Sequence, residues 1–319
     1  MQWPALTDEQ RRKRLQFPAN RVDMVLDTDT RNEVDDQFAL TYLLLCPERV
    51  NLQAIYAAPF QNERSVDARD GMEQSYDEIL RLLGMMHRPT DGLVYKGAGR
   101  FLQETGSRPV DSPAVRDLIA RAMAGPEDKP LYVVAIGAIT NVASALLLAP
   151  EIVSKIVVVW LGGHALYWPH TREFNLREDP AAARIVLESG VPLWLVPCLG
   201  VTSHLITTVH ELRAILGGKN ALCDALIRLL EAYSPTHAGY GKALWDVGAA
   251  ALLIEETWSR STWERCPRLT DDLCWQPDAS GHGMRVVQWQ NRNAIFTDMF
   301  ARLGSFQGPA LSGSGGVDL

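Results

Sequence analysis

Short apolar runs rich in β-branched residues alternate with helix-periodic segments along most of the chain, and this alternation limits the fold more than any other feature. The predicted strands lie at residues 22–26, 52–57, 131–136, 155–161 and 191–197. The predicted helices lie at residues 37–45, 71–83, 141–148, 180–189, 221–233 and 247–254. Alternating strands and helices are typical of βαβ units. We therefore expect an α/β fold with a mostly parallel central sheet and helices on both faces.

The apolar content sets the number of domains. Apolar residues make up 47% of the 319 residues, which is enough for one large core. Residues 304–319 are rich in glycine and serine and show no periodicity. We expect an N-terminal extension at 1–21, a single domain at 22–303 and a flexible C-terminal tail at 304–319.

Charge, cysteine content and apolar run length exclude several classes of protein. No apolar run reaches the ~18 residues that a membrane span needs, and no signal-peptide core follows the basic residues 11–14. A net charge of −7 argues against a nucleic-acid binder. The five cysteines form no Cys-x-x-Cys pair, which argues against a thiolate zinc site or a disulfide framework. We expect a cytoplasmic protein with a small-molecule ligand.

The first predicted strand runs directly into an acidic turn. This turn carries Asp27, Asp29, Glu33, Asp35 and Asp36. Ligands of open parallel sheets bind beyond the carboxyl ends of the strands. Crowded carboxylates repel one another unless a cation lies between them, and hard oxygen ligands suit Ca²⁺ or Mg²⁺. The alternative is a solvated loop that caps the next helix, but the apolar segments on both sides favour a binding site.

One resemblance at this loop points to a phosphatase. Residues 25–30 (VLDTDT) resemble the first motif of haloacid-dehalogenase-type phosphatases, in which the first aspartate accepts the phosphoryl group. This resemblance implies a Mg²⁺-dependent phosphatase with Asp27 as nucleophile. It gives no role to Asp35 and Asp36.

Two later segments resemble signatures of the inosine-uridine preferring nucleoside hydrolases. They are residues 133–141 (VVAIGAITN) and 173–182 (EFNLREDPAA), and residues 35–40 (DDQFAL) and 245–246 (WD) complete the family order. The resemblance covers residues 22–255. It implies a Rossmann-like nucleoside hydrolase fold, Ca²⁺-dependent hydrolysis of a nucleoside or related N-riboside to base and ribose, and a homodimer or homotetramer.

The resemblance also implies the residues of the metal site. Asp29 would bind Ca²⁺ and take a proton from the water molecule on the ion. Asp36 would be a bidentate ligand and Asp246 the final carboxylate ligand. The main-chain carbonyl of Ile136 would complete the site, and Asp27 would order the loop.

The sugar-binding residues follow from the same resemblance. Asp35 would contact the ribose hydroxyls, and Glu173 and Asn175 would form the rest of a ribose clamp. A cation lowers the pKa of its bound water, and carboxylates stabilise the positive charge that develops on the sugar. A chain that keeps this clamp without catalysis would instead be a Ca²⁺-dependent nucleoside- or pentose-binding protein.

The first loop departs from the family pattern. Asp29 and Asp35 lie two residues further apart than is usual, so we expect the added length to bring Arg31, Asn32 and Glu33 toward the site, where Glu33 is an alternative ligand. Two asparagines of the family are also replaced. Tyr167 stands in place of one, and Asn62 is the predicted substitute for the other in substrate binding.

The group that protonates the leaving base also differs from the family. Several members have a histidine at the position of Trp245. His237 and Tyr233 are the predicted catalytic acids, with Tyr240 nearby, because the family places this stretch over the base. Alternatively, Trp245 or Trp168 stacks on the base as a substrate-binding residue, or either is an ordinary core residue.

Overall fold

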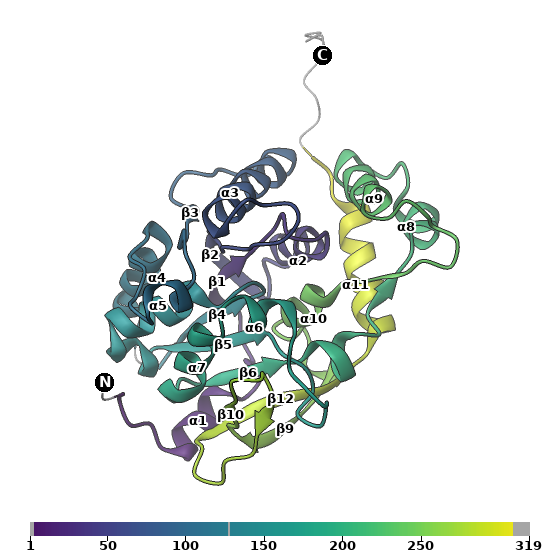
Figure 1. The fold of residues 1–319 in the computed structure, drawn as a ribbon. Helices are drawn as coiled ribbons and strands as arrows, with labels where there is room; N and C mark the ends of the chain where they lie inside the picture. Colours follow the sequence, from purple (N-terminus) through teal and green to yellow (C-terminus); the bar gives the residue numbers. More distant parts are fainter. Residues whose placement is uncertain (1–2, 127, 309–319) are drawn as a thin grey trace.

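An eight-stranded sheet forms the centre of the computed structural model, which describes residues 3–126 and 128–308 (Figure 1). The strand order is β3-β2-β1-β4-β5-β6-β12-β9. In that order the strands are β3 (Val94–Lys96), β2 (Val50–Ala57), β1 (Val22–Thr28), β4 (Leu131–Ala135), β5 (Ile156–Leu161), β6 (Leu193–Val196), β12 (Gly283–Gln290) and β9 (Ser259–Arg265). All neighbours are parallel except β12 and β9, so the predicted mostly parallel sheet is confirmed.

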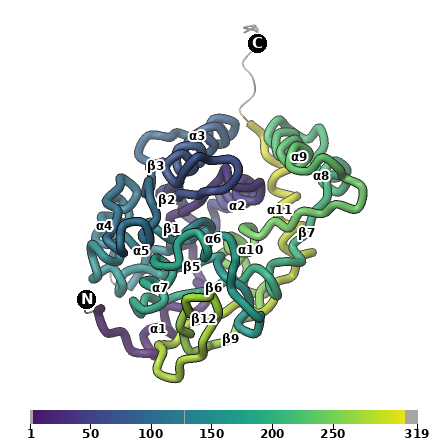
Figure 2. Tube along the Cα trace, in the orientation of Figure 1, coloured from purple at the N-terminus to yellow at the C-terminus, as the bar shows by residue number. Residues whose placement is uncertain are grey.

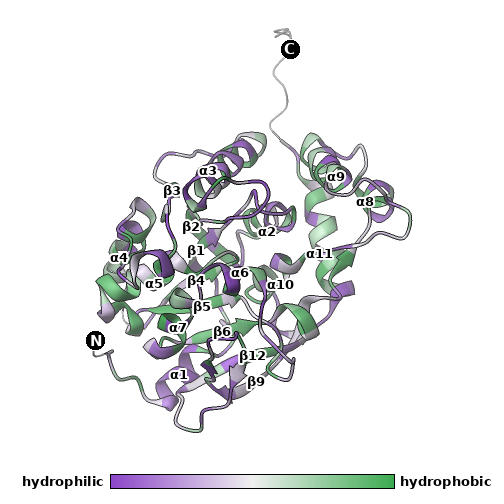
Figure 3. Ribbon diagram, viewed as in Figure 1, coloured by the Kyte–Doolittle hydropathy of each residue, from purple (hydrophilic) through white to green (hydrophobic). Residues whose placement is uncertain are grey.

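Helices cover both faces of this sheet, as predicted. Two separate hydrophobic clusters lie on its two sides, and β1 contributes Met24 and Leu26 to one and Val25 to the other. One side is covered by α2 (Asp35–Leu44), α3 (Ala68–Met85), α8 (Val209–Leu216), α9 (Ala221–Tyr233), α10 (Trp245–Ala251) and α11 (Arg292–Ser305). The other is covered by α4 (Pro113–Ala124), α5 (Thr140–Leu148) and α7 (Pro180–Ser189). The strands β5 and β6, for example, consist of hydrophobic residues along most of their length (Figure 3).

The strand order reverses direction between β1 and β4, and this reversal locates the binding edge. From β1 the chain proceeds to β2 and β3 on one side, and from β4 to β5 and β6 on the other. The connections after β1 and β4 therefore diverge and leave a crevice at the carboxyl ends of these strands. The acidic loop after β1 lies at this crevice.

Several elements were not predicted. They include α1 (Asp8–Arg14), α4, α8, α11, the short α6 (Phe174–Glu178) and the antiparallel pair of β12 and β9. The edge strand β9 has exposed Arg260 and Arg265, so its sequence lacks the apolar run of a buried parallel strand. In Figure 2, α11 lies beside α8 and α9, and α1 lies near β12.

Two predicted boundaries also shift. α11 ends at Ser305, so the expected tail begins inside a helix, and its residues 309–319 lie outside the described part. The helix α10 begins at Trp245, which places Asp246 in its first turn. No helix in residues 3–126 or 128–308 is long and apolar enough to cross a membrane.

Candidate active site

A cavity of about 280 Å³ lies at the crevice beyond β1 and β4. Its wall includes most of the predicted site residues, namely Asp29, Asp35, Asp36, Ile136, Glu173, Asn175, Trp245 and Asp246. The remaining predicted residues, Asn62, Tyr233 and His237, do not line it. The structure therefore brings the expected metal-binding residues together with Asp35, Glu173, Asn175 and Trp245, whereas Asn62 and the two expected acids lie outside the cavity wall.

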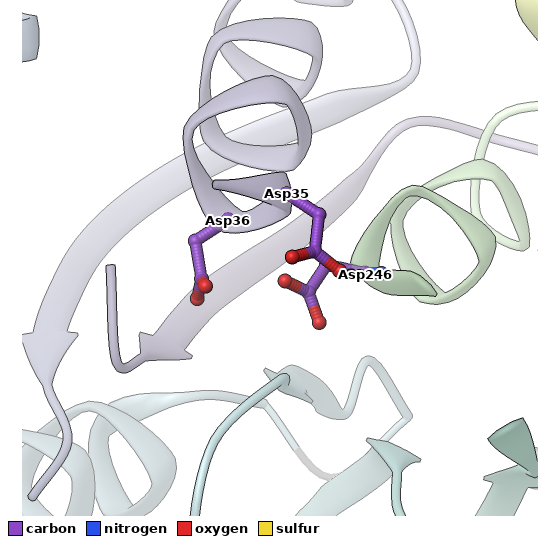
Figure 4. A group of neighbouring side chains, drawn as sticks. All are labelled: Asp35, Asp36 and Asp246. Carbon is purple, nitrogen blue, oxygen red and sulfur yellow. Dashed lines mark hydrogen bonds between the residues drawn. The ribbon is translucent and has the colours of Figure 1, made fainter. Parts of the chain in front are cut away.

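Three carboxylates converge in this cavity from two helix starts. Asp35 and Asp36 occupy the first turn of α2, and Asp246 occupies the first turn of α10 (Figure 4). One oxygen from each lies within 4.8 Å of the others. Burial, followed by the charge of Asp35, raises the pKa of Asp36 to about 7, and burial with Asp35 and Asp36 raises the pKa of Asp246 well above its ordinary value. A divalent cation at this point would offset the repulsion.

Asp29 supplies a fourth buried carboxylate. Its Oδ1 has no hydrogen-bond partner, whereas its Oδ2 accepts a hydrogen bond of 3.2 Å from Asn32 Nδ2. Burial, followed by the charges of Asp36 and Glu178, raises the pKa of Asp29. A buried, unpartnered carboxylate oxygen on a cavity wall is what a metal ion or a water molecule would satisfy. The residues therefore fit a cation bound by oxygen ligands.

Asp27 lies outside the cavity and has a different surrounding. Asn141 Nδ2 donates to its Oδ1 at 2.7 Å, and Asn141 Oδ1 accepts from the Ala98 amide, also at 2.7 Å. A Cβ at Gly97 would lie 2.1 Å from the Ala57 carbonyl oxygen, so only glycine fits this turn. Through Asn141, Asp27 thus links the end of β1 to α5 and to the segment after β3. Its Oδ2 is buried without a hydrogen-bond partner, but Asp27 does not line the cavity, which a phosphoryl acceptor would have to do.

Asp27 gives a testable pH dependence of stability. Burial raises its pKa from 3.8 to about 7, with the Asn141 hydrogen bond opposing that effect. The folded chain thus holds this proton longer than the unfolded chain, so Asp27 makes folding less favourable as the pH rises from 3.8 to about 7. Asparagine does not titrate, so the variant Asp27→Asn should not lose stability in this way. We expect its free energy of unfolding, relative to that of wild type, to increase by roughly 2 to 4 kcal/mol between about pH 5 and pH 8.

Denaturant unfolding with excess chelator at several pH values measures this difference. Asp23→Asn, at an exposed position on the same strand, is the matched control and should follow wild type. If the difference in free energy of unfolding between Asp27→Asn and wild type does not change with pH, the raised pKa of Asp27 is contradicted.

The predicted ribose clamp is fixed by the main chain. The Glu173 carboxylate accepts from the amides of Gly163, Asn175 and Leu176 at 2.9 to 3.0 Å, which caps α6. Asn175 Nδ2 donates to the carbonyl oxygens of Ile136 and Leu161 at 3.2 and 3.0 Å. These bonds hold both side chains in place before any ligand binds.

The predicted acids and Asn62 lie outside the cavity wall. The Tyr233 hydroxyl donates to Glu33 Oε1 at 2.9 Å. His237 Nδ1 is buried without a hydrogen-bond partner, and Asn62 donates to Asn32, which itself lines the cavity. Of the residues proposed to contact the base, Trp245 lines the cavity and Trp168 does not.

Sequence reasoning missed several residues of the cavity wall, among them His164, Arg172 and Phe174, and also the neighbouring Lys242. His164 lines the cavity, and burial followed by the charge of His170 lowers its pKa to about 4, so it is neutral near pH 7. Lys242 lies beside the acidic cluster, 2.6 Å from Glu33 and 3.2 Å from Asp35. The sequence contained no signal for Lys242, because its partners lie more than 200 residues earlier in the chain.

A comparison with known families shows which family the chain belongs to. The sequence model of the family described as "Inosine-uridine preferring nucleoside hydrolase" matches residues 24–298. The chain belongs to this family. The family and the enzyme class predicted from the sequence are thereby confirmed.

Individual nucleoside hydrolases show the same relationship. The pyrimidine-specific ribonucleoside hydrolase RihA of Escherichia coli O81 (strain ED1a) is 27% identical over 237 residues, which are 67% of this chain and 72% of that protein. The structure of a plant nucleoside hydrolase, PpNRh1, matches with a TM-score of 0.70 and 19% identity, covering 90% of this chain and 100% of that one. A purine-preferring ribonucleoside hydrolase from Gardnerella vaginalis matches with a TM-score of 0.67 and 23% identity over 89% and 98% of the two chains. These structures share the fold of the nucleoside hydrolases.

Proposed function

We propose that the chain hydrolyses the N-glycosidic bond of a ribonucleoside, or a related N-riboside, to free base and ribose with the help of Ca²⁺. The observation that carries this proposal is the unpartnered Asp29 oxygen, which lies in one cavity with Asp36, Asp246 and the fixed Glu173. Asp29, Asp36, Asp246 and the Ile136 carbonyl would hold the ion. All of these ligands are hard oxygen atoms, which Ca²⁺ prefers.

Each residue has a defined part in the proposed reaction. A bound Ca²⁺ would lower the pKa of a water molecule in the cavity. Asp29 accepts the proton of the attacking water, and its lack of a partner on Oδ1 leaves that oxygen available. Asp35, Glu173 and Asn175 bind the sugar hydroxyls, and the surrounding carboxylates stabilise the positive charge that develops on the sugar.

The leaving base has a separate environment. Trp245 lines the cavity, whereas Tyr233 and His237 do not. We therefore propose that Trp245 stacks on the base, which is the alternative that the sequence offered to a histidine acid. The Tyr233 hydroxyl already donates a hydrogen bond to Glu33, so its proton is not directed toward the base.

A panel of nucleosides tests the function directly. Purified protein is incubated with purine and pyrimidine ribonucleosides, with and without chelator, and free reducing sugar is measured. We expect ribose release that chelator abolishes, and the rates rank the bases. Calorimetric binding of nucleosides without ribose release would instead identify a nucleoside-binding protein.

The assembly and the location are proposals of the same kind. The family resemblance predicts a homodimer or homotetramer, and sedimentation of the purified protein measures this. A cytoplasmic location is the corresponding prediction from the sequence, and fractionation of cells that express the full chain tests it.

A further inference from the structure

A buried lysine is held at the edge of the carboxylate cluster. The side chain of Lys242 is only 6% exposed. Its ammonium group donates to Glu33 Oε2 at 2.6 Å, to Asp35 Oδ1 at 3.2 Å and to the Ala243 carbonyl oxygen at 2.8 Å. An ammonium group has three donors, so every one of them is used and its position is fixed.

Both carboxylate oxygens of Asp35 accept a hydrogen bond, whereas Asp29 has one oxygen without a partner. Asp35 Oδ1 faces Lys242, and its Oδ2 lies 3.4 Å from the main-chain nitrogen of Asp246, which donates to it. Distance alone would group Asp35 with Asp36 and Asp246 as a metal ligand. The charge arrangement opposes this grouping, because a positive ammonium group already lies against Asp35 and repels a second cation there.

We propose that Lys242 is a positioning residue that keeps Asp35 for the hydroxyl groups of the substrate and leaves the cation to Asp29, Asp36 and Asp246. This inference rests on the proposed function. It gives the lysine a role in dividing neighbouring carboxylates between an ion and a sugar.

The longer first loop supplies the rest of this arrangement. Glu33 lies in the loop between Asp29 and Asp35, and its two oxygens accept hydrogen bonds from Lys242 and from the Tyr233 hydroxyl. Arg64 holds the same loop from the other side by donating to the Asn32 carbonyl oxygen at 3.1 Å. Glu33 thus offsets part of the free-energy cost of burying Lys242, while the ammonium group still lies against Asp35.

Lys242→Met tests the inference through Ca²⁺ binding alone. Isothermal titration with calcium chloride, without nucleoside, should show binding at least about tenfold tighter than in wild type, because a repelling charge is removed and Asp35 becomes free to bind the ion. The KM for nucleoside should rise by more than kcat falls. A variant whose site was merely damaged would bind Ca²⁺ more weakly, which is the opposite sign.

Three further variants complete the experiment. Lys242→Arg keeps the charge and should restore wild-type Ca²⁺ affinity and most of the wild-type KM. Lys242→Gln removes the charge but keeps a polar side chain, and it should repeat the tighter binding if the methionine variant does not fold. Lys96→Met breaks a half-exposed pair with Glu73 and should change neither quantity.

The outcomes separate the two proposals. Equal or weaker Ca²⁺ binding by both folded uncharged variants overturns the role of Lys242. Wild type that binds Ca²⁺ but releases no ribose overturns the proposed function, while the sign of the affinity change still decides the charge effect of Lys242. Wild type that binds no Ca²⁺ overturns both.

Discussion

Asp29→Asn is expected to lower kcat for nucleoside hydrolysis by roughly a thousandfold or more, because it removes both the proposed base and one ligand of the cation. Asparagine has nearly the same shape as aspartate, and its side-chain oxygen can still accept the Asn32 hydrogen bond. The fold should therefore persist, and the unfolding midpoint of the metal-free variant should equal or exceed that of wild type, since a buried carboxylate has been removed. Steady-state kinetics together with thermal unfolding measure both effects.

The matched control for this variant is Asp91→Asn at an exposed turn far along the chain from the acidic loop. It should leave kcat within about twofold, as surface substitutions usually do. Undiminished turnover by a folded Asp29→Asn or Asp29→Ala protein would contradict the role of Asp29. A loss confined to KM would assign Asp29 to substrate binding instead.

Removal of the cation is expected to have the second large effect. Chelation should abolish ribose release, and added Ca²⁺ should restore it. Removal of Ca²⁺ should also destabilise the protein, because a ligand present at a hundred times its Kd adds about 2.7 kcal/mol to the free energy of unfolding. For a chain of this size the midpoint of thermal unfolding should fall by roughly 5 °C.

The size of this destabilisation should depend on pH, with a definite sign. The pKa of Asp36 is raised to about 7, and burial also raises those of Asp29 and Asp246. The folded metal-free chain then holds protons that the unfolded chain has released above 3.8, so its stability falls as the pH rises toward about 7. The difference in free energy of unfolding between the Ca²⁺-loaded and the metal-free protein should therefore be larger at about pH 8 than at about pH 6. The proposed metal site would be contradicted by an equal difference in stability at both pH values, or by full activity in the presence of chelator.

The sequence predicted the parts of the site that are local or carried by motifs. The acidic residues follow a strand with a clear apolar pattern, and residues 173–182 resemble a family signature. The structure shows what Asp179 does in the second of these segments. Its carboxylate accepts hydrogen bonds from the Leu102 amide, the Thr140 hydroxyl and the Ala182 amide at 2.6 to 3.1 Å. Such a residue is both buried and essential to local geometry.

The remaining features depend on contacts that no sequence window contains. The end of α9 at Tyr233 was predicted, but the direction of its hydroxyl is set by Glu33, 200 residues away. Asn62 has the right chemistry for a ligand, yet its side-chain amide donates to Asn32, and Asn32 rather than Asn62 lines the cavity. The strand β9 lacks an apolar run because it is an edge strand with several exposed residues.

The position of Asp246 also constrains the order of events during synthesis. Asp35 and Asp246 meet across 211 residues of chain, with Asp246 at the start of α10. A growing polypeptide that ends before α10 presents the carboxylates of the first loop without their last partner. Contacts of such long range form late in folding. Ca²⁺ would thus stabilise chains whose C-terminal third is already in place, and truncated or stalled products would lack this protection against unfolding and proteolysis.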